Sequence, residues 1–567
     1  MKKMGFQIKK LLSYQTIFPN QHVTLGDLLV NVPSASAIEA ISYYLSRRMN
    51  LLIGEHEVSI WAPWLMQTRS DVKNPVGKYV DNINLGEYAL IDKYALLLLI
   101  SKLLTYYNGR NDELSKDDIS NLFLAYMMCC DERIALSNTL PLPNTDMTAE
   151  DFVRLYLPNA LKTNDIEAPR DYRLMLIKCY MLLVEFPKHH KLFSNYLNEF
   201  CNEKGLPKAK VYLDQLFLLF LELSSNGDFS TNLMEVDESC ENTCRFLDGF
   251  AIDIKQYVHD WDFKMIREKP ILKTGPRRYD FLFMKMFLDK AYTGLLFDMK
   301  DVLVKRGVLD ENKGYENLKS LLGEDFSERF FFYALMKKCF GQHYVNYSGE
   351  ELEKSLGEGM PDFYLRRGNR VFVFECKDAQ VASIKKLSGN YEKIKQAIFE
   401  KYLTNAKGRP KGVKQLTQVI KDKLPAIFNY VDESAPPGTK YVFPIIVYFD
   451  DCFDIEGPEY LLNKEFWNSI GNKNDADRIV IKDLVMVNIE QLMRLEDLFS
   501  NYKLKLASLI NSYIDFKNQT ELNKIFPFNK YLFQEARKKG YVMKKTKWFD
   551  EIYQSLVSMD KSQGKKH

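Results

Sequence analysis

PDFYLRRGNRVFVFECK, residues 361–377, is the stretch of this 567-residue chain that decides its fold. Two apolar-rich runs flank Gly368-Asn369, a pair typical of the two-residue turn of a β-hairpin. With that pair as the loop, Asp362 falls directly opposite Glu375. Counting from the turn makes this a non-hydrogen-bonded pair, whose Cα atoms are about 4.5 Å apart. The sequence therefore predicts an antiparallel hairpin that brings two carboxylates together.

Lys377 lies two residues beyond Glu375, so it projects from the same face of the sheet. Two like charges placed directly across a ladder destabilise a sheet, and the lysine compensates only in part. A divalent cation between the carboxylates compensates better, and oxygen ligands suit Mg²⁺, for which Mn²⁺ can substitute. A metal held in this way beside an ammonium has the parts needed to cleave a phosphodiester. The alternative is a solvated polar face on an ordinary hairpin.

Pro361-Asp362, followed after the hairpin by VFVF and Glu375-Cys376-Lys377, resembles the motif of the PD-(D/E)xK nuclease superfamily. The resemblance implies a C-terminal α/β restriction-endonuclease-like core, a mixed β-sheet flanked by helices. It implies a Mg²⁺-dependent nuclease, an endonuclease-type hydrolase whose expected substrate is DNA. Bacterial nucleases with this arrangement commonly serve in restriction or phage defence. A non-cleaving module that binds nucleic acid or protein on the same fold, and an RNA-directed nuclease, are the alternatives.

The resemblance also implies roles for further residues. Asp362 and Glu375 would bind the metal together with the main-chain carbonyl of Cys376, and Lys377 would be catalytic. A further acid on the first helix of the core is expected to be Glu328, catalytic and metal-binding, with Glu324 as the alternative. Acids near a helix N-terminus also complement its dipole whatever their function. On the helix after the strand, Gln415 is the expected catalytic glutamine; Gln418 is the alternative, and a surface role is the other interpretation.

Positive charge is concentrated after the hairpin. Residues 385–423 contain eleven Lys or Arg and three acidic residues, a net charge of +8, whereas the whole chain is only +3. Such a concentration beside a carboxylate site fits a nucleic-acid backbone, although lysine-rich helices are often only solvated faces. The residues expected to bind nucleic acid are Lys385, Lys386, Lys393, Lys407, Arg409, Lys411 and Lys414.

Composition describes an ordinary globular protein, with 46% hydrophobic and 27% charged residues. Nine irregularly spaced cysteines without a secretory signal fit a reducing cytosol, so we expect a cytoplasmic protein. The strongest apolar run, at 94–100, is far shorter than the ~20 residues of a spanning helix, and no membrane association is expected.

The chain is too long for one core and is expected to be multidomain. Residues 1–250 are expected to form a mainly α N-terminal half, with helices at 36–52, 90–107, 171–186 and 211–224. A locally basic connecting module is expected at 251–310, and the nuclease domain at 311–500. A helical extension with a disordered basic tail is expected at 501–567. The helical half would recognise substrate, a partner protein or a second copy of the chain.

Overall fold

The computed structural model describes residues 9–46, 55–136, 147–168, 170–225, 228–405, 407–471, 478–540 and 546–563. These residues form two compact units. The α/β unit comprises 147–165 and 311–563, and the helical unit comprises 9–136 and 166–310. The ranges 1–250 and 251–310 expected from the sequence thus fall mainly in the helical unit, and 311–500 and 501–567 in the α/β unit. The division into four domains stays a prediction.

The helical unit is built mostly from helices, as expected for the N-terminal half, and residues between 12 and 130 make up most of an apolar core in it. Helix lies within each of the four ranges expected there, although residues 47–54 of the first are outside the described ones. A three-stranded antiparallel sheet has the order β5-β7-β6. The main elements are α1 (Tyr14–Ile17), α2 (Leu25–Leu29), α3 (Ser34–Ser46), α4 (Glu55–Met66), α5 (Ser70–Val80), α6 (Lys93–Thr105), α7 (Lys116–Ala135), α9 (Tyr172–Tyr180), α10 (Lys191–Lys204), α11 (Ala209–Leu223), α12 (Glu241–Asp248), β5 (Leu233–Glu235), β6 (Ile271–Lys273), β7 (Arg278–Phe281), α13 (Lys264–Glu268), α14 (Met284–Leu288) and α15 (Thr293–Lys305).

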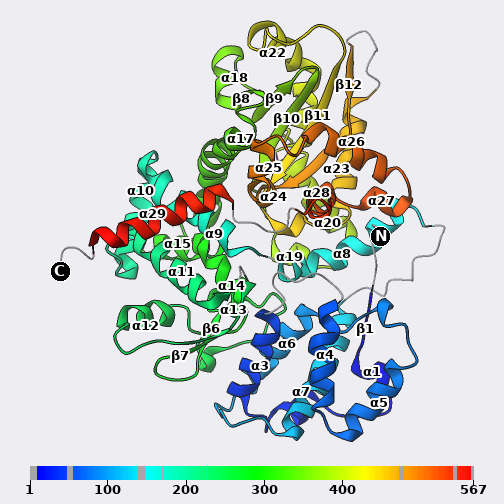
Figure 1. The fold of residues 1–567 in the computed structure, drawn as a ribbon, viewed down its shortest axis with the longest axis vertical. Coiled ribbons are helices and arrows are strands. Elements are labelled where there is room, and N and C mark those ends of the chain that lie inside the picture. Colours follow the sequence, from blue (N-terminus) through cyan, green and yellow to red (C-terminus); the bar gives the residue numbers. More distant parts are fainter. Residues whose placement is uncertain are drawn as a thin grey trace. The chain divides into compact units, whose positions relative to one another are not determined.

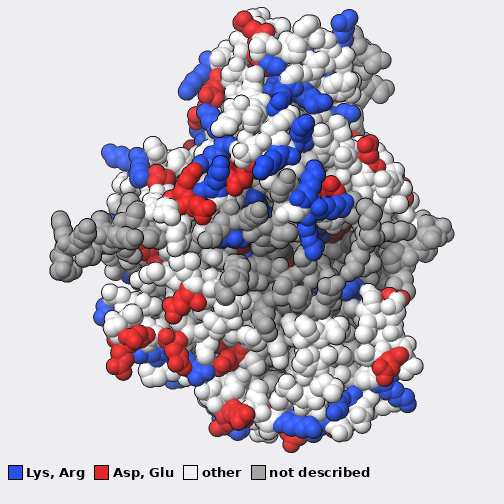
Figure 2. Space-filling view, viewed as in Figure 1, with Lys and Arg blue, Asp and Glu red and all other residues white. Residues whose placement is uncertain are grey.

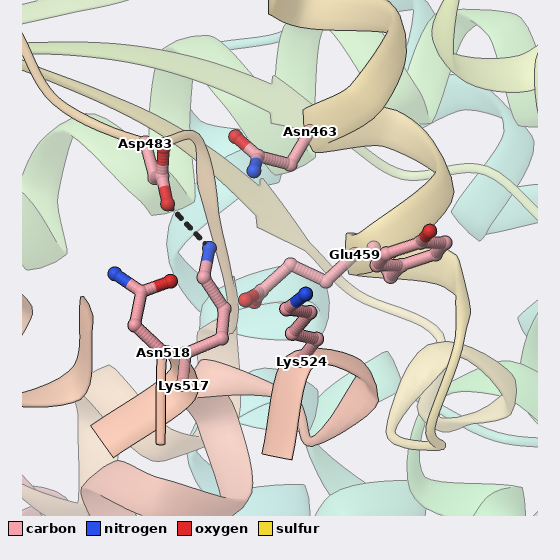
Figure 3. Close-up of a pocket in the computed structure, with 7 residues that line it drawn as sticks. Glu459, Asn463, Asp483, Lys517, Asn518 and Lys524 are labelled. Carbon is pink, nitrogen blue, oxygen red and sulfur yellow. Dashed lines mark ion pairs between the residues drawn. The ribbon is translucent and has the colours of Figure 1, made fainter. Parts of the chain in front are cut away.

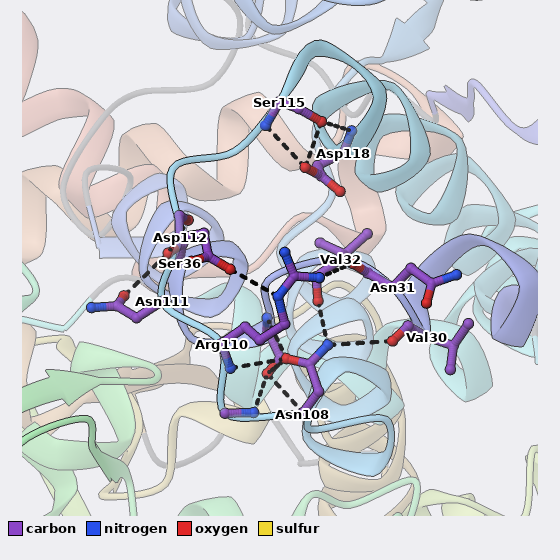
Figure 4. Close-up of polar contacts among 12 residues, drawn as sticks. Val30, Asn31, Val32, Ser36, Asn108, Arg110, Asn111, Asp112, Ser115 and Asp118 are labelled. Atoms are coloured by element: carbon purple, nitrogen blue, oxygen red, sulfur yellow. Dashed lines mark hydrogen bonds and ion pairs between the residues drawn. The ribbon is translucent and has the colours of Figure 1, made fainter.

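The loop between α6 and α7 is held by side-chain to backbone hydrogen bonds (Figure 4). The Asn108 amide accepts from the backbone N–H of Ser34 at 3.2 Å and donates to the carbonyl of Val32 at 2.8 Å. At the far end of the loop, Ser115 and Asp118 form a capping box that begins α7. This loop is therefore ordered by its own polar side chains.

The α/β unit contains a mixed six-stranded sheet among helices (Figure 1), which confirms the coarse fold expected for the C-terminal part. The order is β12-β11-β10-β9-β8, with β13 also paired to β11. β10 and β11 are parallel, and β8, β9 and β10 are successively antiparallel. The strands are β8 (Val345–Ser348), β9 (Phe363–Arg367), β10 (Arg370–Lys377), β11 (Lys440–Tyr448), β12 (Ile479–Ile481) and β13 (Val485–Asn488).

Helices cover both faces of this sheet. On one face, Val371 and Val373 join a core with Ile394 and Leu416 of the following helices. On the other, the rings of Phe363 and Phe374 lie 5.9 and 6.4 Å from that of Phe332. The helices of the unit are α8 (Ala149–Glu167), α16 (Gly314–Leu321), the π-helix η6 (Leu322–Phe332), α17 (Tyr333–Phe340), α18 (Gly349–Leu356), α19 (Ser383–Lys386), α20 (Tyr391–Tyr402), α21 (Val413–Gln418), the π-helix η7 (Val419–Lys423), α22 (Leu424–Tyr430), α23 (Pro458–Ile470), α24 (Ile489–Arg494), α25 (Glu496–Ser500), α26 (Leu506–Lys517), α27 (Glu521–Ile525), α28 (Phe528–Lys538) and α29 (Lys547–Gln563).

Pro444 lies inside β11, a central strand, where the missing N–H of proline would normally break a ladder. β11 pairs with β12 at 440–442 and with β13 at 445–448, so position 444 falls between the two partners on that edge. Successive residues of a parallel strand bond to alternate sides, and the carbonyl of Val442 bonds on the β12 side. Position 444 shares that side. The proline is tolerated because its position faces the gap between β12 and β13, where no backbone N–H is needed.

The C-terminal helices α26 to α28 are joined to the sheet by buried polar contacts (Figure 3). The Glu459 carboxylate accepts from the backbone N–H of Met486 at 2.9 Å and of Phe528 at 3.1 Å. Nearby, Lys517 forms an ion pair with Asp483 at 2.6 Å. These contacts surround a small cavity of about 140 Å³. Residues beyond 500 therefore belong to the same compact unit as the sheet.

The Gly- and Glu-rich approach to Pro361 contains α18, because Ser348 and Glu351 form a capping box at its start. At the C-terminus, α29 continues to Gln563, and the last four residues of the basic tail lie outside the described ones, so the disorder expected there stays a prediction. Among the helices of the described residues, none has the length and apolar character needed to cross a membrane.

Candidate active site

The hairpin forms as expected, with a two-residue loop and the predicted register. Arg367 pairs with Arg370 and Phe363 with Phe374, and Gly368 adopts φ +57° in the loop. The ladder ends at the Phe363–Phe374 pair, so Asp362 and Glu375 lie one step beyond its last pair in the same register. At this point a side chain takes over the contact between the strands: Oδ2 of Asp362 accepts the backbone N–H of Cys376 at 2.6 Å. Asp362 still reaches the strand that carries Glu375, through its carboxylate rather than through its backbone.

Lys377 lies against both carboxylates. Its Nζ is 2.8 Å from Oε2 of Glu375 and 3.8 Å from Oδ2 of Asp362. The Glu375 side chain is fully buried, and those of Asp362 and Lys377 are 12% and 17% exposed. The three residues expected from the hairpin are therefore brought together at the end of β10, largely shielded from water.

The pKa values of Glu375 and Lys377 in this cluster are shifted far from their ordinary values. Burial, followed by the Asp362 charge, raises the pKa of Glu375 to about 8, although Lys377 opposes the rise. Burial alone would lower the pKa of Lys377, but Glu375 and Asp362 outweigh it and raise that pKa above its ordinary value. Lys377 therefore remains an ammonium at physiological pH, whereas burial and the Asp362 charge disfavour the ionised form of Glu375.

Glu328 lies on η6 within electrostatic reach of this cluster. Burial and then the Asp362 charge raise the pKa of Glu328 to about 9, with a smaller contribution from Glu375. Among the described residues, its carboxylate forms no hydrogen bond or ion pair. The alternative acid, Glu324, is more exposed and pairs with Arg329 at 2.8 Å. The structure thus places Glu328, and not Glu324, beside the two carboxylates.

The donor set fits a hard divalent cation. Oε1 of Glu375 is buried and has no hydrogen-bond partner in the described part of the chain. The Asp362 carboxylate and the main-chain carbonyl of Cys376, whose side chain is buried, supply further oxygens. No group of three or more His, Cys, Asp or Glu side chains arranged to hold a metal occurs in the described ranges. A cation here would therefore depend on two carboxylates, a carbonyl and water, as Mg²⁺ often does.

Gln415 has a local role. Its side-chain oxygen accepts the backbone N–H of Gly412 at 2.7 Å at the start of α21, which packs against β10. No hydrogen bond joins it to the acidic residues among those the structure describes, and Gln418 is exposed. The catalytic role expected for Gln415 stays a prediction.

The expected nucleic-acid-binding residues fall into two groups. Lys385 pairs with Glu400 at 2.6 Å and Lys386 with Asp165 at 3.1 Å. The other five have no ion-pair partner among the described residues: Lys393, Lys407, Arg409, Lys411 and Lys414. On the face drawn in Figure 2, Lys and Arg side chains gather over the α/β unit.

One of the unpaired cations lies near the acidic cluster. Burial, together with the charges of Lys401 and Lys377, lowers the pKa of Lys411. The basic segment thus comes close to the site through Lys411.

Five neighbours of the site were not expected from the sequence. The Asp378 carboxylate, directly after Lys377, bonds Lys319 and Ser327. Gly349 donates its N–H to the carbonyl of Asp362 at 2.8 Å, and a Cβ there would lie 3.0 Å from the Tyr333 hydroxyl. Of these neighbours, only Asp378 could have been found from the sequence, because it directly follows the motif. The others are distant in sequence, and only the fold brings them together.

Comparisons with protein-family models, with curated proteins and with solved structures find no match to this chain.

Proposed function

We propose that the α/β unit has a restriction-endonuclease-like core and is a Mg²⁺-dependent nuclease that hydrolyses phosphodiester bonds, with DNA as the expected substrate. One observation carries the proposal: the Lys377 ammonium lies 2.8 Å from Glu375 and 3.8 Å from Asp362, in a buried acidic cluster. The parallel pairing of β10 with β11, next to the antiparallel hairpin, supports the same core.

In this proposal, each residue of the candidate site has a role in binding the cation or the nucleic acid. Asp362, Glu375 and the Cys376 carbonyl would hold the cation, and Glu328 would assist from η6. When bound, the cation would supply a Lewis acid for the phosphoryl oxygen and lower the pKa of water. Lys377 keeps its positive charge and is placed to orient the attacking water or to stabilise charge that develops on the phosphate. The unpaired cations between 393 and 414 would hold the nucleic-acid backbone.

The test is cleavage of plasmid, linear and single-stranded DNA and of RNA by the purified protein, with Mg²⁺ or Mn²⁺ and with EDTA. We expect Lys377→Ala to lower the cleavage rate at least about 100-fold, because it removes a charge aimed at the reacting phosphate. Lys530→Ala is a matched control, since Lys530 also lies 2.8 Å from a buried glutamate, Glu456. It should cleave at the wild-type rate.

The alternatives give different results. Nucleic-acid binding that persists in EDTA, without turnover under any condition, would indicate a non-cleaving binding module. Cleavage confined to RNA would indicate an RNA-directed nuclease. Cleavage that survives Lys377→Ala would overturn the proposed site.

The biological role rests on the resemblance alone. A part in bacterial restriction or phage defence fits a nuclease attached to a separate helical unit, which would recognise substrate, a partner protein or a second copy of the chain.

A further inference from the structure

Asp378 joins three elements at the edge of the candidate site. It follows Lys377 directly at the end of β10, and its side chain is only 3% exposed. One carboxylate oxygen bonds Nζ of Lys319 on α16 at 2.6 Å. The other accepts from the hydroxyl of Ser327 on η6 at 2.7 Å. We name these three residues the Asp378 bridge.

The bridge ends one residue away from Glu328. η6 is a π-helix, a rare form that is frequently found at functional sites. Since Ser327 and Glu328 are consecutive on it, a contact that fixes Ser327 also fixes the direction in which Glu328 leaves the helix. Glu328 itself has no hydrogen-bond or ion-pair partner among the described residues, so nothing in its own contacts holds it beside Asp362.

Asp378 is unsuited to bind a cation directly. Both of its oxygens are engaged, one by an ammonium and one by a hydroxyl. Asp378 would therefore influence a cation indirectly, through the residues whose positions it fixes. Outer partners of metal ligands typically change metal affinity 10- to 100-fold when they are removed.

We propose that Asp378 is a positioning residue that holds η6 against the end of β10 and so keeps Glu328 close to the cation that Asp362 and Glu375 would bind. This inference rests on the proposed function, because it assumes that the cluster binds a cation. It adds Asp378, Ser327 and Lys319 to the groups on which the site depends.

The test is Mn²⁺ binding to the full-length protein, measured by titration calorimetry without nucleic acid. We expect Asp378→Asn to weaken binding about 10- to 100-fold, because the amide loses the charge that pairs with Lys319 and has one acceptor oxygen in place of two. If Asp378 acts through Glu328, Asp378→Asn should add no further loss when Glu328→Gln is already present. Ser327→Ala, which leaves the Lys319 ion pair intact, should weaken binding in the same direction.

Asp483→Asn is the matched control. Asp483 pairs with Lys517 at 2.6 Å and accepts from Nε1 of Trp467 at 2.7 Å, the same distances as in the Asp378 bridge. It lies between β12 and β13, which pair with the edge of β11 opposite β10, and should leave Mn²⁺ affinity unchanged. Thermal unfolding of each variant shows whether a loss of binding reflects a loss of fold, and Ser327→Ala replaces Asp378→Asn if the latter does not fold.

The outcomes separate the inference from the proposed function. Wild-type affinity in both Asp378→Asn and Ser327→Ala would overturn the inference and leave the nuclease proposal intact. Losses that multiply between Asp378→Asn and Glu328→Gln would also overturn it, since the two residues would then act independently. A wild-type protein that binds no Mn²⁺ would overturn the proposed function, and the inference with it.

Discussion

At the scale of single residues, the acidic cluster makes folding and cation binding depend on pH in a specific way. The pKa of Glu375 is raised from an ordinary 4.5 to about 8, and that of Glu328 to about 9, with burial as the largest cause. A carboxyl whose pKa is higher in the folded state contributes stability below its unfolded pKa. That contribution is lost as the pH rises through the folded pKa, because the folded protein must then bury a charge.

We therefore expect the unfolding temperature in EDTA to fall as the pH is raised from about 5 to about 9. Other buried acids, such as Asp280, contribute in the same direction. The combined variant Glu328→Gln with Glu375→Gln isolates the site and should show a shallower fall. Saturating Mg²⁺ should also reduce the fall in the wild type, because the cation binds the ionised carboxylates. Equal pH dependence with and without Mg²⁺ would contradict a cation site here.

At the scale of elements, the hairpin was predictable because a two-residue turn sets the register of both strands. The end of the ladder was not, since there the Asp362 side chain takes over the contact by bonding the Cys376 N–H. Neither β12 nor α18 was expected from the sequence. Three residues of β12 have too little periodicity to be recognised, and the capping box of α18 was hidden in a Gly- and Glu-rich stretch.

The basic elements after the hairpin give a prediction of their own. Replacing the unpaired Lys407, Arg409, Lys411 and Lys414 with glutamine should weaken DNA binding and reduce the slope of log affinity against log salt by roughly 0.9 for each phosphate that is no longer neutralised. The control replaces Lys385 and Lys386, whose charges are already paired with Glu400 and Asp165. It should have the smaller effect. Filter binding or anisotropy over a salt series measures both, and equal losses in the two sets would contradict a specific role for the unpaired cations.

At the scale of the whole molecule, α8 shows that dividing a sequence into consecutive domains does not reveal which unit a helix packs in. Its residues lie within the first 250, yet Phe152, Val153, Leu157 and Leu161 pack in the core of the α/β unit. Gly457 accommodates this approach, since a Cβ there would lie 3.2 Å from Val153 and 3.7 Å from Leu157. Helical periodicity reveals that a helix has an apolar face but not which core receives it. The candidate site was therefore more predictable than the boundaries of the unit that contains it.

The last prediction follows from this arrangement. A fragment of residues 311–567 lacks α8 and should not fold cooperatively, because its core loses Phe152, Val153, Leu157 and Leu161. Burial of each such side chain contributes about 1.5–3 kcal/mol, and together they approach the about 5–15 kcal/mol that a domain has in total. Fusing residues 147–165 to this fragment through a Gly/Ser linker of about 20 residues should restore it.

Near-ultraviolet circular dichroism, binding of a hydrophobic dye and thermal unfolding distinguish the two forms. In the same fusion, Leu157→Asp with Leu161→Asp should abolish the rescue, because the linker and the helix length are kept while the apolar contacts are removed. The restored fragment should also bind Mn²⁺ through Asp362 and Glu375, since both residues lie in this unit. Cooperative unfolding of 311–567 alone, without dye binding, would show that α8 is dispensable and that the unit begins at residue 311.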